Sequence, residues 1–347
     1  MSALTVPARP DGDEAVPRPL PWRRMAGVTW RQHRFALAGV AVLLGVLAVY
    51  EWLTGESLYH AWVAATACHP AGSATCQDLV RAFPENFLTL GSLLQVVPPL
   101  IGAFIGAPVL ARELETGTFR YAWTQGMRRW RWALAKLVLL AAALAAATGG
   151  FGLLVSWHFQ PYFGTGNQAL GLPQLSPFDS DVFSLRGVAL PAWTLAAFAI
   201  GVLAGMLIRR VLPAVVAALA AYAGLAFAAG LYLRPHYLTP LVTRDTNVPG
   251  TAWIISQWWT KDGKFAFGFP PFNLLNQFCS APPGPSGKGG GGLSFTQCLA
   301  PHGYTQWTSY QPASRFWPFQ LIEGGWLLAL SVLLIAATIW LVQRRAA

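Results

Sequence analysis

Charged residues are scarce in this chain. Only 11% of its 347 residues are Asp, Glu, Lys or Arg, whereas soluble domains carry about a quarter. Hydrophobic residues make up 54% and aromatic residues 13%. A composition this poor in charge excludes an ordinary soluble domain and indicates a protein that lies largely within a membrane.

The chain also lacks the short motifs of common catalytic sites. It contains no G-x-S-x-G and no H-E-x-x-H sequence, and its apolar runs hold no paired carboxylates. The run from Gly284 to Gly289 superficially resembles a phosphate-binding loop but lacks the G-x-x-x-x-G-K-[S/T] spacing. Neither C-x-x-C nor a paired-histidine spacing is present. We therefore expect no catalytic site, no metal site and no cofactor in this chain.

Six apolar runs are long enough to cross a hydrocarbon core, which needs about 20 residues. They are Phe35–Leu53, Phe87–Leu110, Trp132–Trp157, Gly187–Ile208, Val211–Leu233 and Phe319–Val342. Apart from residues at the edges, the ionised side chains within them are Lys136, at one end of the third run, and Glu323, a few residues into the sixth. Each would cost roughly 3 kcal/mol at the bilayer centre. We predict an all-α membrane protein with six transmembrane helices.

Basic residues predict the orientation. With Lys136, four segments hold 16 of the 24 Lys and Arg residues: 1–34, 111–131, 209–210 and 343–347. The alternate segments hold the other eight: 54–86, 158–186 and 234–318. By the positive-inside rule, both termini of this multi-pass protein lie in the cytoplasm. The net charge of +10 reflects this asymmetry and an attraction to anionic membrane lipid, so we expect no nucleic-acid partner.

The remaining segments divide the chain further. Residues 1–21, rich in Pro, Asp and Ala, predict a disordered cytoplasmic tail. Residues 22–34 place arginines and apolar residues on opposite faces of a helix, which is typical of an amphipathic interfacial helix. That helix either contacts a partner as well or serves only as an anchor. Five transmembrane helices follow within residues 35–233, and residues 319–347 form the sixth and the cytoplasmic C-terminus.

The largest exterior segment, 234–318, predicts an extracellular subdomain inserted before the last span. Its tryptophans at 253, 258 and 259 suggest a helix on the outer membrane surface. Pro98-Pro99 should kink the second span. G-x-x-x-G pairs occur in the second span and in the fourth; they indicate either close helix packing or chance spacing in a chain with 34 glycines.

All four cysteines fall on the exterior side of this topology. Cys68 and Cys76 lie in the first exterior loop, and Cys279 and Cys298 in the last. Pairing within each loop gives two disulfides suited to an oxidising exterior. Metal binding with nearby histidines is the alternative interpretation.

Glu323 is the one acid within a span that suggests a site. It could bind a cationic cargo or a proton, as ionisable groups in membranes often do. Alternatively, it lies near the outer headgroups and is simply hydrated. A proton-coupled carrier would normally show several such groups and an internal repeat, and neither is visible.

Residues 111–136 form an unusually charged connection between two spans. As a helix that begins at Ala111, the segment places Glu113 and Glu115 in its first turn, where the helix dipole favours acids, and Gly117 breaks it. A second, basic helix over 126–136 then leads into the third span. Such a segment either docks into a cleft of a cytosolic protein or is a solvated loop.

The same segment carries a family resemblance. The spacing E-x-x-x-G-T at Glu113, Gly117 and Thr118, with Gln125 and the basic residues after it, resembles the loop between spans two and three of ABC-type-2 permeases. These are membrane subunits of bacterial ABC exporters. The overall plan is similar too, and residues 310–326 resemble the approach to the last span in actinobacterial members. Gly126-Met127 departs from the basic residue and Ser or Thr that members often have there.

The resemblance implies a function. The inner segment would be a coupling helix seated in a cytosolic ATPase, through Arg112, Glu113, Glu115, Gly117, Thr118, Arg120, Gln125, Arg128 and Arg129. ATP and Mg would bind to that ATPase, and a second permease copy, in a homodimer, would complete the transporter in a bacterial plasma membrane. Largely uncharged spans favour an amphiphilic or hydrophobic cargo for export. The alternative is a non-transporting sensor or scaffold whose extracellular subdomain binds a ligand.

Overall fold

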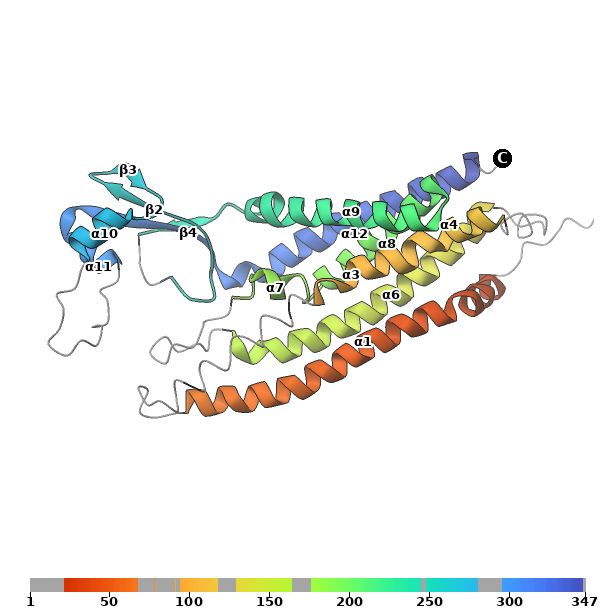
Figure 1. Cartoon of the computed structure of the whole chain (residues 1–347), viewed down its shortest axis with the longest axis horizontal. Helices are drawn as coiled ribbons and strands as arrows, with labels where there is room; N and C mark the ends of the chain where they lie inside the picture. Colours follow the sequence, from red (N-terminus) through yellow and green to blue (C-terminus); the bar gives the residue numbers. More distant parts are fainter. Residues whose placement is uncertain are drawn as a thin grey trace, which may run out of the picture.

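Long helices lying side by side dominate the molecule, and a small sheet stands at one end of them (Figure 1). This computed structural model describes residues 22–67, 78, 91, 94–117, 129–163, 176–244, 248–279 and 295–345. Within these residues, six helical segments are long and apolar enough to cross a membrane: Gly27–Ala65, Val97–Thr116, Trp130–Tyr162, Ala189–Ile208, Val211–His236 and Ala313–Arg344. The predicted six-helix membrane fold is confirmed.

The elements follow one another simply. The longer helices are α1 (Trp22–Thr66), α4 (Ala107–Thr116), α6 (Arg129–Phe159), α8 (Ala189–Ile208), α9 (Val211–Ala228) and α12 (Phe316–Arg345). The short ones are α3 (Val97–Ile101), α7 (Ser180–Phe183), α10 (Phe272–Phe278) and α11 (Phe295–Leu299), with π turns at Gly102–Gly106 and Ala229–Leu233. Single 3₁₀ turns occur at Gln160–Tyr162, Arg234–His236, Ala300–His302 and Ala313–Arg315. The strands are β1 (Leu241–Thr243), β2 (Trp253–Lys261), β3 (Lys264–Phe267) and β4 (Tyr304–Gln311).

Helix α1 is longer than the predicted first span. Its 45 residues span about 67 Å at 1.5 Å per residue, roughly twice the thickness of a hydrocarbon core. The predicted amphipathic segment 22–34 is therefore the first part of one continuous helix. Thr29 on it is buried, whereas Trp30 is 55% exposed. Its position in the membrane interface stays a prediction.

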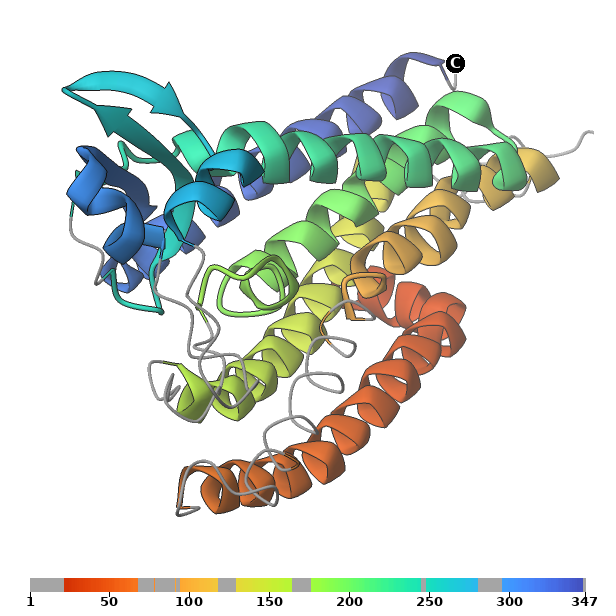
Figure 2. The same cartoon turned by 60° about the vertical axis from the view of Figure 1, so that its left-hand side comes forward.

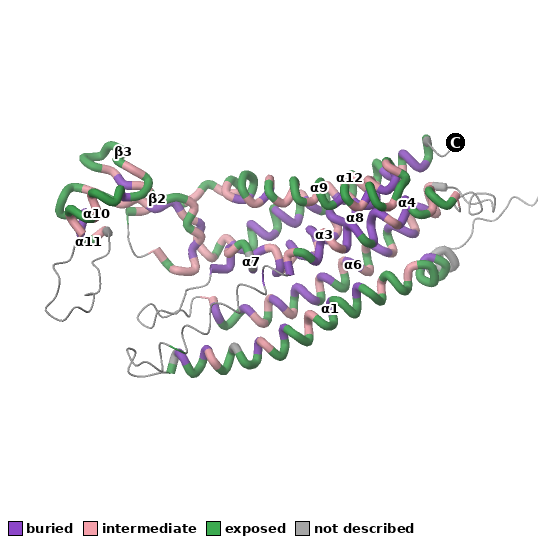
Figure 3. The backbone as a smooth tube through the Cα atoms, in the orientation of Figure 1, coloured by how far each residue is buried: buried purple, intermediate pink, exposed green. Residues whose placement is uncertain are grey.

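Helix α8 lies at the centre of the bundle. It is apolar on all sides, as expected for a helix without a water-facing surface, and it packs against α3, α4, α6, α9 and α12. Figure 3 shows buried residues concentrated on α8 and α4, whereas α1 and α9 carry long exposed stretches. The central helix thus fixes the positions of most other spans.

Small residues allow α8 to approach the second span closely. A Cβ added at Gly106 would lie 2.6 Å from the carbonyl oxygen of Phe198, and one added at Gly201 would overlap the carbonyl of Gly102. Both G-x-x-x-G pairs face this contact, since Gly205 packs on the backbone of Ala107. The interpretation as close helix packing is confirmed, within one subunit.

The kink expected at Pro98-Pro99 stays a prediction, since residues 92–93 just before α3 lie outside the described residues. These prolines lie in the first turn of α3, which begins at Val97, and a first turn has no partners for its N–H groups in any case. Within the described part of the span, an irregularity follows as the π turn Gly102–Gly106, just before Pro108. Pro108 cannot donate a backbone hydrogen bond, and helices often change register at such a residue.

The segment between the fifth and sixth spans contains a four-stranded antiparallel sheet of order β1-β4-β2-β3. The predicted surface helix at the tryptophans is therefore wrong: residues 253–261 form β2, paired along its length with β4. Aromatic and β-branched residues favour a strand, and the partner lies some fifty residues later in the chain. Asp262 and Gly263, with φ of 52° and 79°, make the tight turn into β3.

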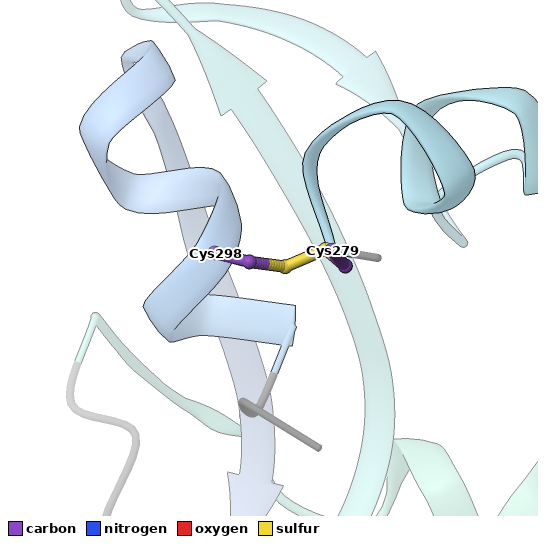
Figure 4. The surroundings of a disulfide bond; sticks show 2 residues. All are labelled: Cys279 and Cys298. Carbon is purple, nitrogen blue, oxygen red and sulfur yellow. A yellow bond between two sulfur atoms is a disulfide. The ribbon is translucent and has the colours of Figure 1, made fainter. Parts of the chain in front are cut away.

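The described chain ends, Trp22 and Arg345, lie at one end of the bundle, and the sheet lies at the other (Figures 1 and 2). A disulfide joins Cys279, after α10, to Cys298 in α11 (Figure 4). This confirms the predicted pairing in the last loop. Cys68 and Cys76 lie outside the described residues.

Candidate functional site

The segment predicted to couple to an ATPase leaves the bundle at the end away from the sheet. Gly117, with a φ of 69°, ends α4 in the left-handed conformation that glycine adopts without strain. The predicted break at Gly117 is confirmed. However, the helix begins far upstream of Ala111, so Glu113 and Glu115 lie in its last turns and not in its first. The helix dipole disfavours acids there by about 0.3–1 kcal/mol, so their positions need compensating partners.

Lys136 compensates Glu113. Its Nζ lies 2.6 Å from Glu113 Oε1 and donates a second hydrogen bond to the Val109 carbonyl at 3.1 Å. The Lys136 side chain is 1% exposed and that of Glu113 12%. Gln32 of α1 donates a hydrogen bond to the same carboxylate oxygen at 2.6 Å. One acid therefore joins α1, α4 and α6.

Glu115 makes a different contact. Its Oε2 accepts a hydrogen bond of 3.3 Å from the backbone N–H of Val211, the first residue of α9. A carboxylate is favoured at a helix N-terminus, where N–H groups have no partners within the helix. The contact is exposed. It ties α4 to the start of α9.

The structure thus connects the two helices that flank the predicted coupling segment, the C-terminal part of α4 and the N-terminal part of α6. These two helix ends are called the stems of the segment. Of its other predicted residues, Arg112 is exposed at the end of α4 and the backbone of Arg129 begins α6. Thr118, Arg120, Gln125 and Arg128 lie outside the described residues. Because Glu113 and Lys136 are paired with each other, the stems have a fixed spacing, as a rigid connection to a partner requires.

Glu323 lies in a second cluster, near the sheet end of the bundle. Its carboxylate, which is fully buried, forms two hydrogen bonds with Arg234, at 2.7 and 2.9 Å. Trp193 Nε1 donates a third at 2.8 Å, and the Tyr237 hydroxyl a fourth at 3.3 Å. Arg234 also donates to the Ser184 hydroxyl. The network joins α12 to α7, α8 and the end of the fifth span.

The alternative interpretation of Glu323 as a hydrated residue near the headgroups is therefore wrong. Burial and the neighbouring carboxylate raise the pKa of Tyr237 above its usual range, so this phenol stays protonated and can donate to Glu323. Hydrogen bonds to an ionised carboxylate are charge-assisted and therefore stronger than bonds between neutral groups, which makes the network stable. A role of Glu323 in cargo or proton binding stays a prediction.

Sequence reasoning missed the partners of the buried acids. Arg234 was assigned to the exterior loop, although it follows the fifth span directly and is 7% exposed. The signal was present, since Arg234 and Glu323 are opposite charges near the ends of two spans, at the same end of the bundle as the sheet. Glu51 and His158 were missed as well. Their side chains face each other across α1 and α6, Nε2 to Oε2 3.7 Å, and no local pattern relates residues so far apart.

Arg186, between α7 and α8, is another buried charge. It stacks on the rings of Phe163 and Phe316 and donates one hydrogen bond to Gln160 at 3.2 Å. Its Nε and Nη1 atoms are buried without a hydrogen-bond partner. Burial lowers the pKa of Arg186 to about 10, so the side chain is still charged at neutral pH.

Residues 37–234 match the family described as ABC-2 membrane transporter related. Because the match covers more than half of the chain, the chain belongs to this family. It is a multi-pass membrane transport subunit of the ABC-2 permease type, as the resemblance predicted. No curated protein and no solved structure matches the chain. The matched region ends at Arg234, so the sheet and α12 lie beyond it.

Proposed function

We propose that this permease is a subunit of an ATP-driven exporter in a bacterial plasma membrane, and that residues 111–131 contact a separate cytosolic ATPase. Both termini would lie in the cytoplasm and the sheet outside. The observation that carries this proposal is the fixed pair of stems around residues 117–128, on a chain of the ABC-2 family. A second copy of the chain would complete the translocation path, and lipid would cover the exposed apolar faces.

The role of the acids differs from that of a simple docking patch. Since Glu113 is paired with Lys136 and Gln32, it serves to hold the segment in place. The arginines of the segment are then the residues that reach the ATPase, through charge-assisted contacts. ATP-driven closure of two ATPases would displace the segment, and the stems would pass this displacement to α4 and α6 as one body.

The cargo class follows from the spans. The two pairs with a permanent cation, Glu113–Lys136 and Glu323–Arg234, neutralise themselves within the described bundle. Such spans offer little to a hydrated ion and suit an amphiphilic or hydrophobic molecule. We infer that the cargo is amphiphilic and leaves the cell.

Co-purification tests the proposal. The chain is solubilised from its native host, and the proteins that accompany it are identified by mass. A stoichiometric soluble ATPase should accompany the wild type and be lost when Arg112, Arg120 and Arg128 are changed to Glu. The matched control changes Arg209 and Arg210 to Glu, at the inner corner between α8 and α9, and should keep the ATPase.

Recovery of the chain without an ATPase would contradict the proposal and favour the non-transporting sensor or scaffold. That alternative draws on the outer sheet, which lies beyond the matched region and is large enough to bind a ligand. Loss of the ATPase in both variants would show a general effect of charge and no specific contact. Elution of each variant as a monodisperse peak on size exclusion confirms that it is folded.

A further inference from the structure

Three acids in the described spans are buried or partly buried: Glu51 and Glu323 are buried and Glu113 is 12% exposed, and they differ in their partners. Glu113 is paired with Lys136, and Glu323 with Arg234, each a permanent cation. Glu51 is 1% exposed, yet neither of its carboxylate oxygens has a hydrogen-bond partner. Its nearest basic group is His158, 3.7 Å away, which carries charge only when it is protonated. Glu51 is thus the one buried acid of the three without a permanent counter-charge.

A buried carboxylate without donors is costly, because water is lost and nothing replaces it. The local packing nevertheless holds Glu51 and His158 together. Gly55, one turn beyond Glu51, lies directly under the imidazole ring, where a Cβ would collide with it. The glycine makes room for His158 between the helices.

A cavity of about 330 Å³ opens beside this pair, between α1 and α6. Its lining residues belong to the C-terminal parts of α1 and α6 and the turn after α6. These helix ends lie on the side of the bundle where the sheet stands (Figure 1). Its walls include His158 and the aromatic side chains of Trp52, Tyr59, Trp157 and Tyr162. Trp52 and Trp157 stack at its open side, with ring centroids 5.7 Å apart and exposed fractions of 56% and 65%.

This combination matches the chemistry that recognises organic cations. Aromatic faces attract ammonium groups electrostatically, by about 0.5–2 kcal/mol for each good contact. Glu51 lies one layer behind the wall, and Glu56 adds an exposed carboxylate beside the cavity. A volume at the lower end of the range for small-molecule sites suits a small cation or the head of a larger amphiphile.

We propose that the cavity between α1 and α6 binds an organic ammonium group, with Glu51 as its counter-charge and the tryptophans around its methyl or methylene groups. The cation would supply the positive charge that Arg234 and Lys136 supply permanently to the other two acids. The site stands without the transport proposal; its use as a cargo site rests on that proposal.

Equilibrium binding to the purified full chain tests the site without ATP or a partner. The probe is tritiated benzyltrimethylammonium, and the detergent is dodecyl maltoside, which has neither charge nor amine. We expect saturable binding that Glu51→Gln weakens about tenfold, a factor equal to 1.4 kcal/mol. Trp157→Leu, on the exposed wall, should weaken it severalfold. Asp262→Asn is the matched control, since it removes one negative charge at a remote turn, and it should bind like the wild type.

Neopentylbenzene, the carbon isostere of the probe, separates charge recognition from apolar partition. Equal competition by the neutral isostere and the cation would overturn the proposal. So would the absence of saturable binding, or equal losses in Glu51→Gln and Asp262→Asn. Trp157→Leu keeps the test decisive if Glu51→Gln does not fold, because an exposed side chain is not needed for the core.

The ammonium group has two sources, a cargo molecule or a membrane lipid. Added phosphatidylethanolamine that competes with the probe, where phosphatidylglycerol does not, identifies the lipid headgroup as a ligand. Absence of such competition assigns the site to a soluble or amphiphilic amine. Both results keep the ammonium site, and a failed ATPase co-purification leaves either result unchanged.

Discussion

The Glu323–Arg234 pair gives the sharpest test of how the bundle is held together. Arg234→Met leaves a buried carboxylate with two hydrogen bonds fewer, at 2.7 and 2.9 Å. Removing one partner of a buried pair costs about 3–5 kcal/mol, whereas removing both is often close to neutral. We therefore expect each of Arg234→Met and Glu323→Gln to lose about 3–5 kcal/mol of unfolding free energy. The double variant should lose no more than either single variant.

Unfolding in mixed micelles of SDS and dodecyl maltoside, followed by circular dichroism, measures these free energies. Trp193→Phe is the control, since it removes one hydrogen bond from Glu323 and leaves the ion pair, at a cost of about 1 kcal/mol. Losses that simply add in the double variant would refute the reasoning, because they would show two independent residues.

The double variant also separates two roles of Glu323. If the acid only holds helices together, the folded double variant keeps ATP hydrolysis in complex with the ATPase. If Glu323 carries a proton for a proton-driven carrier, Glu323→Gln stops transport, while ATP depletion at a fixed proton gradient does not.

Three further predictions concern other parts of the molecule. Glu113→Lys alone should lower the melting temperature by placing a partly buried cation beside the buried Lys136, and the exchange with Lys136→Glu should restore part of the loss; equal melting temperatures would contradict the pair. Replacing both cysteines of the Cys279–Cys298 disulfide by Ser should lower the stability of the sheet region by about 3 kcal/mol. Limited proteolysis should then cleave the sheet region faster and the spans at an unchanged rate. An unchanged rate in the sheet region would mean that the sheet is stable without the disulfide. Arg186→Met should raise the melting temperature at pH 7. Burial lowers the pKa of Arg186 in the folded protein to about 10, so keeping the side chain charged costs folding free energy at any pH below that value. The gain in melting temperature should shrink above pH 10, and a lower melting temperature of the variant at pH 7 would contradict this reasoning.

The spans could be predicted because their signal is local. A run of about 20 apolar residues has few alternatives, and each of the six predicted runs overlaps a helix that is long and apolar enough to cross a membrane. The break at Gly117 is equally local, since only glycine adopts its φ without strain. The Cys279–Cys298 disulfide was predicted because both cysteines lie in one predicted exterior loop, and no distance between them entered that prediction.

What could not be predicted depends on contacts between distant segments. The tryptophans at 253–259 form a strand because residues 304–311 lie beside them, and helix-like spacing in one segment does not reveal that partner. The interpretation of Glu323 as a hydrated residue was wrong for the same reason, since its counter-charge lies 89 residues away. Glu113 and Glu115 were predicted in the first turn of a helix that begins at Ala111, because the second apolar run ends at Leu110. In the structure α4 continues through this point and ends at Thr116.

The strengths of these contacts indicate which parts of the bundle move together. Separating Glu113 from Lys136 would leave a buried and a partly buried charge unpaired, so α4 and α6 should move as one body at the end away from the sheet. The exposed hydrogen bond from Val211 to Glu115 costs only about 0.5–1.5 kcal/mol to break. At the sheet end, Glu323 holds α12 to α8 and to the end of the fifth span. We therefore expect a displacement of residues 117–128 to open the contact between α4 and the start of α9 first, while the Glu323–Arg234 cluster stays intact and serves as the pivot.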